Sequence, residues 1–276
     1  MSTTPRYCYR HPDRETGLSC SDCGRPICYE CMTPAPVGLR CPDHSGKPQG
    51  IQKITATATR ATTGIGSRRV NAVTMALIGI NVLVYLSELA AGGTVNGLGN
   101  TIYEHGALYG PLVAHGDWWR LITSAFLHYG PFHLAINMYS LYFAGSILEQ
   151  VIGRWRFALL YLASGLAGAA GALVWSPNVP TVGASGAIFG ILGALFVLER
   201  RGNIATGGQV GGLIVLNLIF TFVLSSFISV GGHVGGLIGG LLLMLAFARF
   251  RRSWQVSAAA AAVLAVAAIV VAYSAV

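Results

Sequence analysis

The sequence predicts an all-α polytopic membrane protein with a small cytosolic zinc-binding domain before its first membrane span. Three observations support this fold class. Of the 276 residues, 53% are hydrophobic and only 10% are charged, and the mean hydropathy is +0.59. This composition is typical of chains that cross a bilayer several times. Long apolar runs follow one another from residue 70 onward, whereas all six cysteines lie between Cys8 and Cys41.

The composition divides the chain into four segments. Residues 1–46 are rich in Cys, His and Pro, and residues 47–69 form a basic stretch rich in Thr, Ala and Gly that is typical of a flexible linker. Residues 70–250 contain six apolar runs, and residues 251–276 contain a seventh. The first 70 residues lack the apolar segment of a secretory signal, so we expect membrane insertion to begin with the first apolar run.

Most of the seven runs approach the roughly 20 residues that a helix needs to cross about 30 Å of hydrocarbon. The run that begins at Ser185 is short, so we expect this serine to lie below the outer surface, inside the bundle. The connection over 92–131 contains Trp118 and Trp119 and is expected to be a structured loop partly in the outer leaflet. The predicted spans are 70–91, 132–150, 156–175, 185–199, 209–228, 232–248 and 254–275.

Arginine sets the expected orientation. The connections before the first span and after the second, fourth and sixth contain nine arginines, and the opposite connections contain only Arg120. The positive-inside rule then places the N-terminus in the cytosol and the C-terminus outside. We expect an integral membrane protein, in a bacterial cell membrane. The net charge of +8 is no evidence for nucleic-acid binding, because most of the downstream arginines flank apolar runs.

Polar side chains gather where three spans begin at the outer face. The second span opens with His133 and Asn137, which share one helix face, the fourth with Ser185 and the sixth with His233. Polar groups inside a membrane are costly and usually functional. Ser185 and His233 could form a nucleophile–base dyad if the two helices touch. Small residues at four-residue spacing favour that contact: Gly186, Gly190 and Ala194 in one span, and Gly231, Gly232, Gly235, Gly236, Gly239 and Gly240 in the other.

The same residues could stabilise an oxyanion. Ser185 begins a helix, where backbone N–H groups are free, and His133 and Asn137 could add side-chain donors. The acids Glu149 and Glu199 lie at the inner ends of their spans, so neither is placed to complete a triad. The pattern therefore indicates a Ser–His dyad, with no cofactor for catalysis.

Three stretches together resemble the rhomboid family of intramembrane proteases over roughly residues 70–250. The stretches are WWRLITSAFLHYGPFHLAINM (118–138), VGASGAIFGILGAL (182–195) and GGHVGGLIGG (231–240). The resemblance implies a six-helix core, here followed by a seventh transmembrane helix. It also implies a serine endopeptidase that cuts transmembrane protein substrates within the lipid bilayer, near their outer ends.

The resemblance assigns a role to individual residues. Ser185 would be the nucleophile, His233 the general base, and His133 and Asn137 the oxyanion-hole donors. The fifth span and the connection after it would form a lateral gate and cap. Active-site support is implied for Gly183, Gly186 and Phe189, and structural positions for Trp119, Arg120, His128 and Glu149.

The N-terminal cysteines and histidines form four pairs with two-residue spacers. Eight ligands suffice for two tetrahedral structural Zn²⁺ sites, and a segment of this size needs metal because it cannot bury enough core. The pattern resembles B-box zinc fingers, which implies an interleaved pairing of first with third and second with fourth; sequential pairing is the alternative. A cytosolic protein is the expected partner, and no nucleic acid. The ligands are Cys8, His11, Cys20, Cys23, Cys28, Cys31, Cys41 and His44.

Two other classes of function compete with the protease. A transporter or channel would line its pathway with the intramembrane His, Asn and Ser side chains, but it predicts an inverted repeat that we do not find. A non-catalytic membrane adaptor would act through its zinc domain alone.

Overall fold

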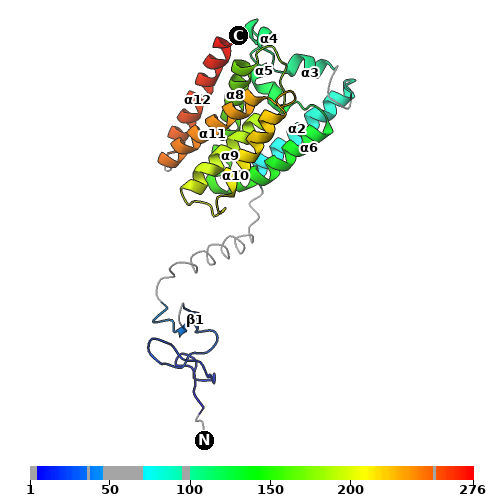
Figure 1. Ribbon diagram of the computed structural model, residues 1–276. Helices are drawn as coiled ribbons and strands as arrows, with labels where there is room; N and C mark the ends of the chain where they lie inside the picture. Colours follow the sequence, from blue (N-terminus) through cyan, green and yellow to red (C-terminus); the bar gives the residue numbers. More distant parts are fainter. Residues whose placement is uncertain (1–4, 36–37, 46–70, 95–99, 251–252) are drawn as a thin grey trace. The chain divides into compact units, whose positions relative to one another are not determined.

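The structure is a computed structural model that describes residues 5–35, 38–45, 71–94, 100–250 and 253–276 (Figure 1). The chain separates into two compact units, Met1–Arg68 and Arg69–Val276. Each unit has its own buried cluster, so each is described by itself.

The first unit consists mainly of turns around its cysteines. Strands β1 (Thr33–Pro34) and β2 (Leu39–Arg40) form a short antiparallel pair. Ile27 is fully buried, and the rest of the core consists largely of cysteine side chains. So little apolar surface cannot by itself offset the entropy of ordering the segment.

The regular secondary structure among the described residues of the second unit is helical, apart from one isolated bridge between Leu108 and Thr181; turns and loops connect the helices. Among the described residues, four helices are long and apolar enough to cross a membrane, and each of the seven predicted spans coincides with a helix or a helical run. The predicted class of integral, all-α polytopic membrane protein is therefore confirmed. The elements are α2 (Ala72–Ala90), α3 (Thr101–Gly106), α4 (Gly110–Ala114), α5 (Arg120–Thr123), η2 (Ser124–Phe126), α6 (Pro131–Ser140), η3 (Leu141–Gly145), α7 (Ser146–Ile152), α8 (Arg154–Trp175), α9 (Ser185–Arg200), α10 (Gln209–Val223), α11 (Val230–Arg249) and α12 (Trp254–Ser274).

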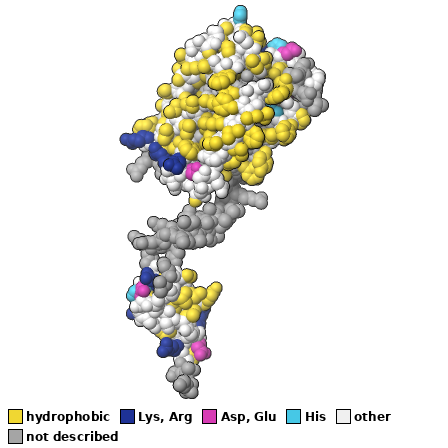
Figure 2. Space-filling view, in the orientation of Figure 1, with side chains coloured by type: hydrophobic (Ala, Val, Ile, Leu, Met, Phe, Trp, Pro, Cys, Tyr) yellow, Lys and Arg dark blue, Asp and Glu magenta, His cyan; other side chains and the backbone are white. Residues whose placement is uncertain are grey.

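The surface of the helical unit is suited to lipid. Figure 2 shows hydrophobic side chains over most of its visible face. Large apolar side chains such as Leu83, Val223 and Val263 are exposed, which a protein in water would avoid over so wide an area.

The centre of the bundle is formed by α8, α9 and α11, which approach one another at glycines. A Cβ atom on Gly236 would overlap the backbone of Gly186, and one on Gly240 would overlap that of Gly190. Such small residues allow membrane helices to pack backbone to backbone. Figure 1 shows α12 (red) alongside this centre, and Arg156 Nε of α8 donates to Ser257 Oγ of α12 at 3.0 Å.

Two spans differ in detail from the sequence prediction. The predicted second span contains a turn of π-helix, η3, between α6 and α7. The fifth span was predicted to reach residue 228, and this is wrong because α10 ends at Val223 and residues 224–227 form a turn. Ser225 and Ser226 follow the helix end, and serine competes with helical hydrogen bonds.

The predicted structured loop consists of α3, α4, α5 and η2. Its centre is Arg120, which is buried: Nε donates to Asp117 at 2.8 Å, and Nη1 donates to the carbonyls of Glu104 and Ala107 at 2.8 Å each. Trp119 Nε1 donates to the His105 carbonyl at 3.0 Å. These bonds fold the loop back on itself, next to the segment that leads into α9.

Candidate active site

Ser185 is the first residue of α9, and the loop before it is held by backbone hydrogen bonds. Thr181 exchanges two bonds with Leu108, of 2.9 and 3.0 Å, and Gly183 N–H donates to the Ser124 carbonyl at 2.9 Å. The first N–H groups of a helix have no partner within it. Ser185 is half-buried at this helix start, where the first backbone N–H groups of α9 have no partner within the helix.

Gly183 brings the ring of His133 close to Ser185. Its φ of +128° is a backbone conformation that favours glycine. A Cβ atom at this position would lie 2.8 Å from Cε1 and 2.9 Å from Nε2 of His133. No other residue fits between the imidazole and the serine loop.

The hydrogen bonds of His133 define its tautomer. Tyr129 N–H donates to His133 Nδ1 at 3.2 Å, so Nδ1 is an acceptor and the neutral ring has its proton on Nε2. This Nε2–H faces Gly183. Asn137, one turn later on α6, is buried and donates one of its two side-chain N–H groups to the His133 carbonyl at 3.0 Å. His133 therefore presents an N–H group to the loop before α9, and the bond of Asn137 to the His133 carbonyl uses only one of its two amide hydrogens.

His233 lies in the first turn of α11, which Ser229 caps by accepting from Gly232 N–H at 3.1 Å. Its ring stacks on Phe189 of α9, with centroids 4.0 Å apart and planes inclined by 20°. His233 Nδ1 lies 2.7 Å from Thr221 Oγ1 of α10. The imidazole is thus held by contacts with two other helices.

Ser185 and His233 lie on helices that touch at the neighbouring glycines. A Cβ atom on Gly186 would lie 3.2 Å from the Gly232 carbonyl oxygen. The structure shows no hydrogen bond between the two side chains, although both are among the described residues. Catalytic hydrogen bonds are often long before substrate binds.

A pocket lies beside Ser185, and its walls are mostly small residues. Gly165, Gly168, Ala169 and Ala172 of α8 contribute one side, and Ser229 and Gly232 contribute another. Such a pocket has room beside the hydroxyl for a small side chain.

The ring of His128 packs against the ring of His133. It is fully buried, and the two ring centroids lie 5.2 Å apart. Burial lowers the pKa of His128 to about 3, so this histidine is neutral at physiological pH. Its backbone nitrogen lies 3.4 Å from a carboxylate oxygen of Glu88, a buried acid near the C-terminal end of α2.

Glu149 lies at the end of α2 that is remote from Glu88 and His128. Its carboxylate accepts from the backbone N–H groups of Val73 and Thr74, at 3.1 and 2.8 Å, and from the Thr74 hydroxyl at 2.7 Å. Glu149 therefore caps the start of α2. It lies on α7, twelve residues after Asn137 of α6, and so is remote from the candidate site.

Two polar residues of this region were not singled out from the sequence, Glu88 and Thr221. Each is buried within an apolar run. Their position within an apolar run could have identified them from the sequence, because polar side chains inside membrane spans usually have a function.

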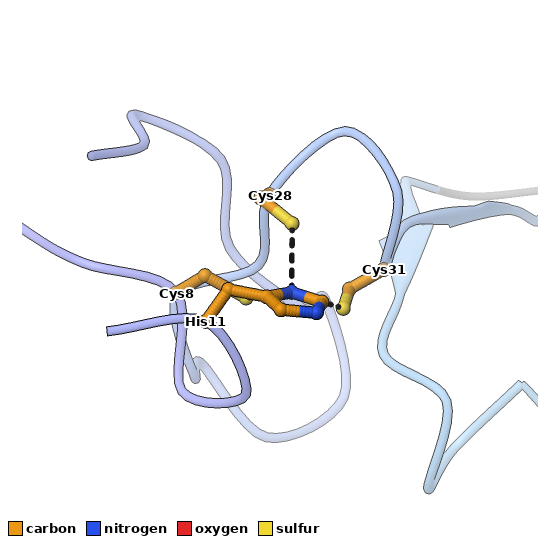
Figure 3. Close-up of side chains that lie close together, drawn as sticks. All are labelled: Cys8, His11, Cys28 and Cys31. Carbon is orange, nitrogen blue, oxygen red and sulfur yellow. Dashed lines mark hydrogen bonds between the residues drawn. The ribbon is translucent and has the colours of Figure 1, made fainter. Parts of the chain in front are cut away.

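The eight Cys and His side chains of the first unit form two clusters of four, in the interleaved order. One consists of Cys8, His11, Cys28 and Cys31, and Figure 3 shows His11 Nδ1 facing the sulfurs of Cys28 and Cys31, each at 3.4 Å. The other consists of Cys20, Cys23, Cys41 and His44.

These clusters fit metal ions. Within each, the ligand atoms all lie within 4.8 Å of one another. Cys23 and Cys41 sulfurs are 3.8 Å apart, which is close to the edge of a tetrahedron with metal–sulfur bonds of about 2.3 Å. Three thiols and one imidazole are a common ligand set for structural zinc.

Comparison with known proteins shows that part of this chain is similar to a known domain family. The family model of the Rhomboid domain matches residues 115–250. The chain is 39% identical over 157 residues to Rhomboid protease GluP of Bacillus subtilis, covering 55% of this chain and 30% of that protein. It is 35% identical over 156 residues to RHOMBOID-like protein 7 of Arabidopsis thaliana, covering 53% and 50%.

A third relative bears a different name. The chain is 36% identical over 121 residues to Inactive RHOMBOID-like protein 8 of Arabidopsis thaliana, covering 43% of this chain and 34% of that protein. The chain thus spans half or less of the length of each of these three relatives.

Proposed function

We propose that this chain, which carries a rhomboid domain over residues 115–250, is an intramembrane serine endopeptidase that acts through Ser185 and His233. One observation carries the proposal. The starts of α6, α9 and α11 converge, so that the ring of His133 meets Gly183 while Gly186 and Gly232 bring the helices of Ser185 and His233 together. Acyl transfer requires a nucleophile, a base and oxyanion donors close together, and this convergence supports that assignment.

The reaction begins when Ser185 Oγ attacks the carbonyl carbon of the scissile bond and its proton passes to His233. The bond between carbonyl carbon and nitrogen then breaks, and the imidazolium returns the proton to the leaving amine. Water, activated by the same ring, hydrolyses the acyl-enzyme. Ser185 is restored, and one peptide bond has consumed one water molecule.

The negative charge of each tetrahedral intermediate lies on the former carbonyl oxygen. The Ser185 N–H, the Nε2–H of His133 and the side-chain amide of Asn137 are the proposed donors. A single donor of this kind is worth about 3–4 kcal/mol of barrier in soluble proteases. Gly183 allows His133 to approach, and Phe189 holds the ring of His233.

The substrates are transmembrane segments of other proteins, cut near their outer ends. A peptide bond in a membrane helix is shielded by its own hydrogen bonds, and unsatisfied backbone in lipid costs several kcal/mol. The substrate must therefore unwind easily at the cut, as Gly, Pro or small polar residues allow. The walls of Gly, Ala and Ser around Ser185 favour a small side chain next to that bond.

The two N-terminal clusters would hold structural Zn²⁺, each by three cysteines and one histidine. Bound zinc would supply folding energy that the small core lacks. With four protein ligands no position is left open for catalysis. We assign this unit to the cytosolic side of a bacterial cell membrane, where it would bind a protein partner, and the C-terminus to the outer side.

Cleavage in proteoliposomes tests the proposal. The purified chain is reconstituted with a panel of transmembrane segments that have Gly, Ala or Ser near their outer ends. Ser185→Ala is compared with Ser87→Ala, which changes an exposed serine of α2. We expect cleavage by the wild type and by Ser87→Ala, and none by Ser185→Ala. Equal cleavage by both variants would contradict the role of Ser185 as the nucleophile, and no cleavage of any segment would favour the non-catalytic adaptor.

A further inference from the structure

Thr221 is a buried polar residue on α10 that the dyad mechanism does not use. Only 1% of its surface is exposed, although α10 otherwise buries only Val210 and Ile214. Its Oγ1 lies 2.7 Å from the carbonyl oxygen of Asn217, one turn earlier, and 2.7 Å from His233 Nδ1. Both distances are those of hydrogen bonds.

The two contacts determine where the protons lie. A threonine hydroxyl has one hydrogen to donate and lone pairs to accept with. The main-chain carbonyl oxygen of Asn217 can only accept a hydrogen bond, so the Thr221 hydroxyl donates its hydrogen to it. Thr221 Oγ1 must then accept from His233, and the neutral imidazole has its proton on Nδ1. The lone pair of Nε2 is left free.

We propose that Thr221 is a positioning residue that holds His233 in the tautomer able to take the proton of Ser185. The inference rests on the proposed function, and it assigns to a neutral hydroxyl the role that an aspartate has in a Ser–His–Asp triad. When Nε2 accepts the Ser185 proton, the imidazolium keeps its Nδ1–H bond to Thr221. No charge moves onto the threonine, so a buried acid is not needed.

The other contacts of His233 do not set the tautomer. Phe189 stacks on the ring face, and the Ser229 cap acts on the backbone of α11. Both hold the ring in place, but neither distinguishes one ring nitrogen from the other. That distinction comes from Thr221.

The contact also connects two helices. Thr221 is on α10, most of whose side chains are exposed, and His233 is on α11. Displacement of α10 to admit a substrate would break the Oγ1–Nδ1 bond. His233 would then regain its competent tautomer when α10 returned.

The test compares three variants of the full chain. Thr221→Val removes the hydroxyl at constant shape, Thr221→Ser keeps it, and Val215→Ala changes an exposed side chain elsewhere on the same helix. A lost buried hydrogen bond costs about 1–3 kcal/mol, so kcat of Thr221→Val should fall roughly 10- to 100-fold with KM changed less than about 2-fold. Thr221→Ser and Val215→Ala should stay within about 3-fold of wild type.

The tautomer itself is read by nitrogen-15 NMR of histidine-labelled protein in detergent, with the His233 signals identified by their loss in His233→Ala. The wild type and Thr221→Ser should show a protonated Nδ1 and an unprotonated Nε2, and Thr221→Val a shift toward the other tautomer. An unchanged tautomer in Thr221→Val, or equal losses of kcat in the Val and Ser variants, would overturn the inference.

This readout separates the two proposals, because it needs no catalysis. A protein that shows the Nδ1–H tautomer but cleaves nothing would contradict the proposed function alone. A protein that cleaves normally with Thr221→Val would contradict only the role of Thr221.

Discussion

The polar side chains of the candidate site are held in different ways. His133 receives a backbone N–H bond, Asn137 is tied to the carbonyl one turn before it, and His233 is bonded to Thr221. Ser185 is placed by its loop, through Gly183. A nucleophile must move during the reaction, whereas donors and base act best when they are fixed in advance.

Asn137 allows a direct test of the oxyanion hole. Asn137→Ala removes an N–H donor that should matter only once negative charge develops on the carbonyl oxygen. We expect kcat to fall about 100-fold or more, with KM changed less than about 2-fold. Steady-state kinetics on a cleaved segment measures both constants. A rise in KM at constant kcat would show instead that Asn137 binds the substrate.

At this scale the sequence indicates which residue types meet, but not how their protons are arranged. The spacing of His133 and Asn137 and their common depth with Ser185 were sufficient to select them. Thr221 was missed because its partner is twelve positions away across a helix end, and no periodicity links the two. Glu88 was missed because a single acid in an apolar run does not indicate which backbone N–H group it will bind, here that of His128.

The helices are organised by glycine. Where α11 crosses α9, Gly236 faces Gly186 and Gly240 faces Gly190, with backbones in contact. The four-residue repeat predicted this contact, since residues at that spacing share a helix face. The end of α10 was predicted less well, because hydropathy continues through Leu224 and Phe227, whereas the helix ends at Val223 and a turn follows it.

Gly236 should therefore be sensitive to a single methyl group. Gly236→Ala would push the new Cβ into the backbone of Gly186, next to Ser185. Overpacking of this kind costs about 1–3 kcal/mol, and we expect a lower midpoint of thermal unfolding in detergent. Gly79→Ala is the matched control, because nothing lies within 4 Å of a Cβ at that helical position. Equal midpoints for the two variants would mean that the contact at Gly236 contributes no stability.

The whole molecule combines a membrane unit with a small Cys/His unit. Composition alone was sufficient to separate them, and it predicted the eight clustered side chains. The pairing could not be derived from spacing, since interleaved and sequential arrangements use the same residues. In the structure the clusters are interleaved, which ties the first half of the segment to the second.

Zinc content tests this unit. Native mass spectrometry of the full chain should show two Zn²⁺ ions, and the double variant Cys8→Ser/Cys28→Ser, which removes two ligands of one cluster, should show one. Because the second unit has its own core, we expect the double variant to keep its protease activity in detergent. Sequential pairing would instead disturb both sites in this variant.

The most direct measurement is the site of covalent modification by a fluorophosphonate, a probe that reacts with activated serines. The labelled chain is digested and the adduct is located by mass spectrometry. The proposed chemistry predicts one adduct, on Ser185, that is lost in His233→Ala and retained in Ser87→Ala. An adduct on another serine, or none under conditions that label a known serine hydrolase, would contradict it.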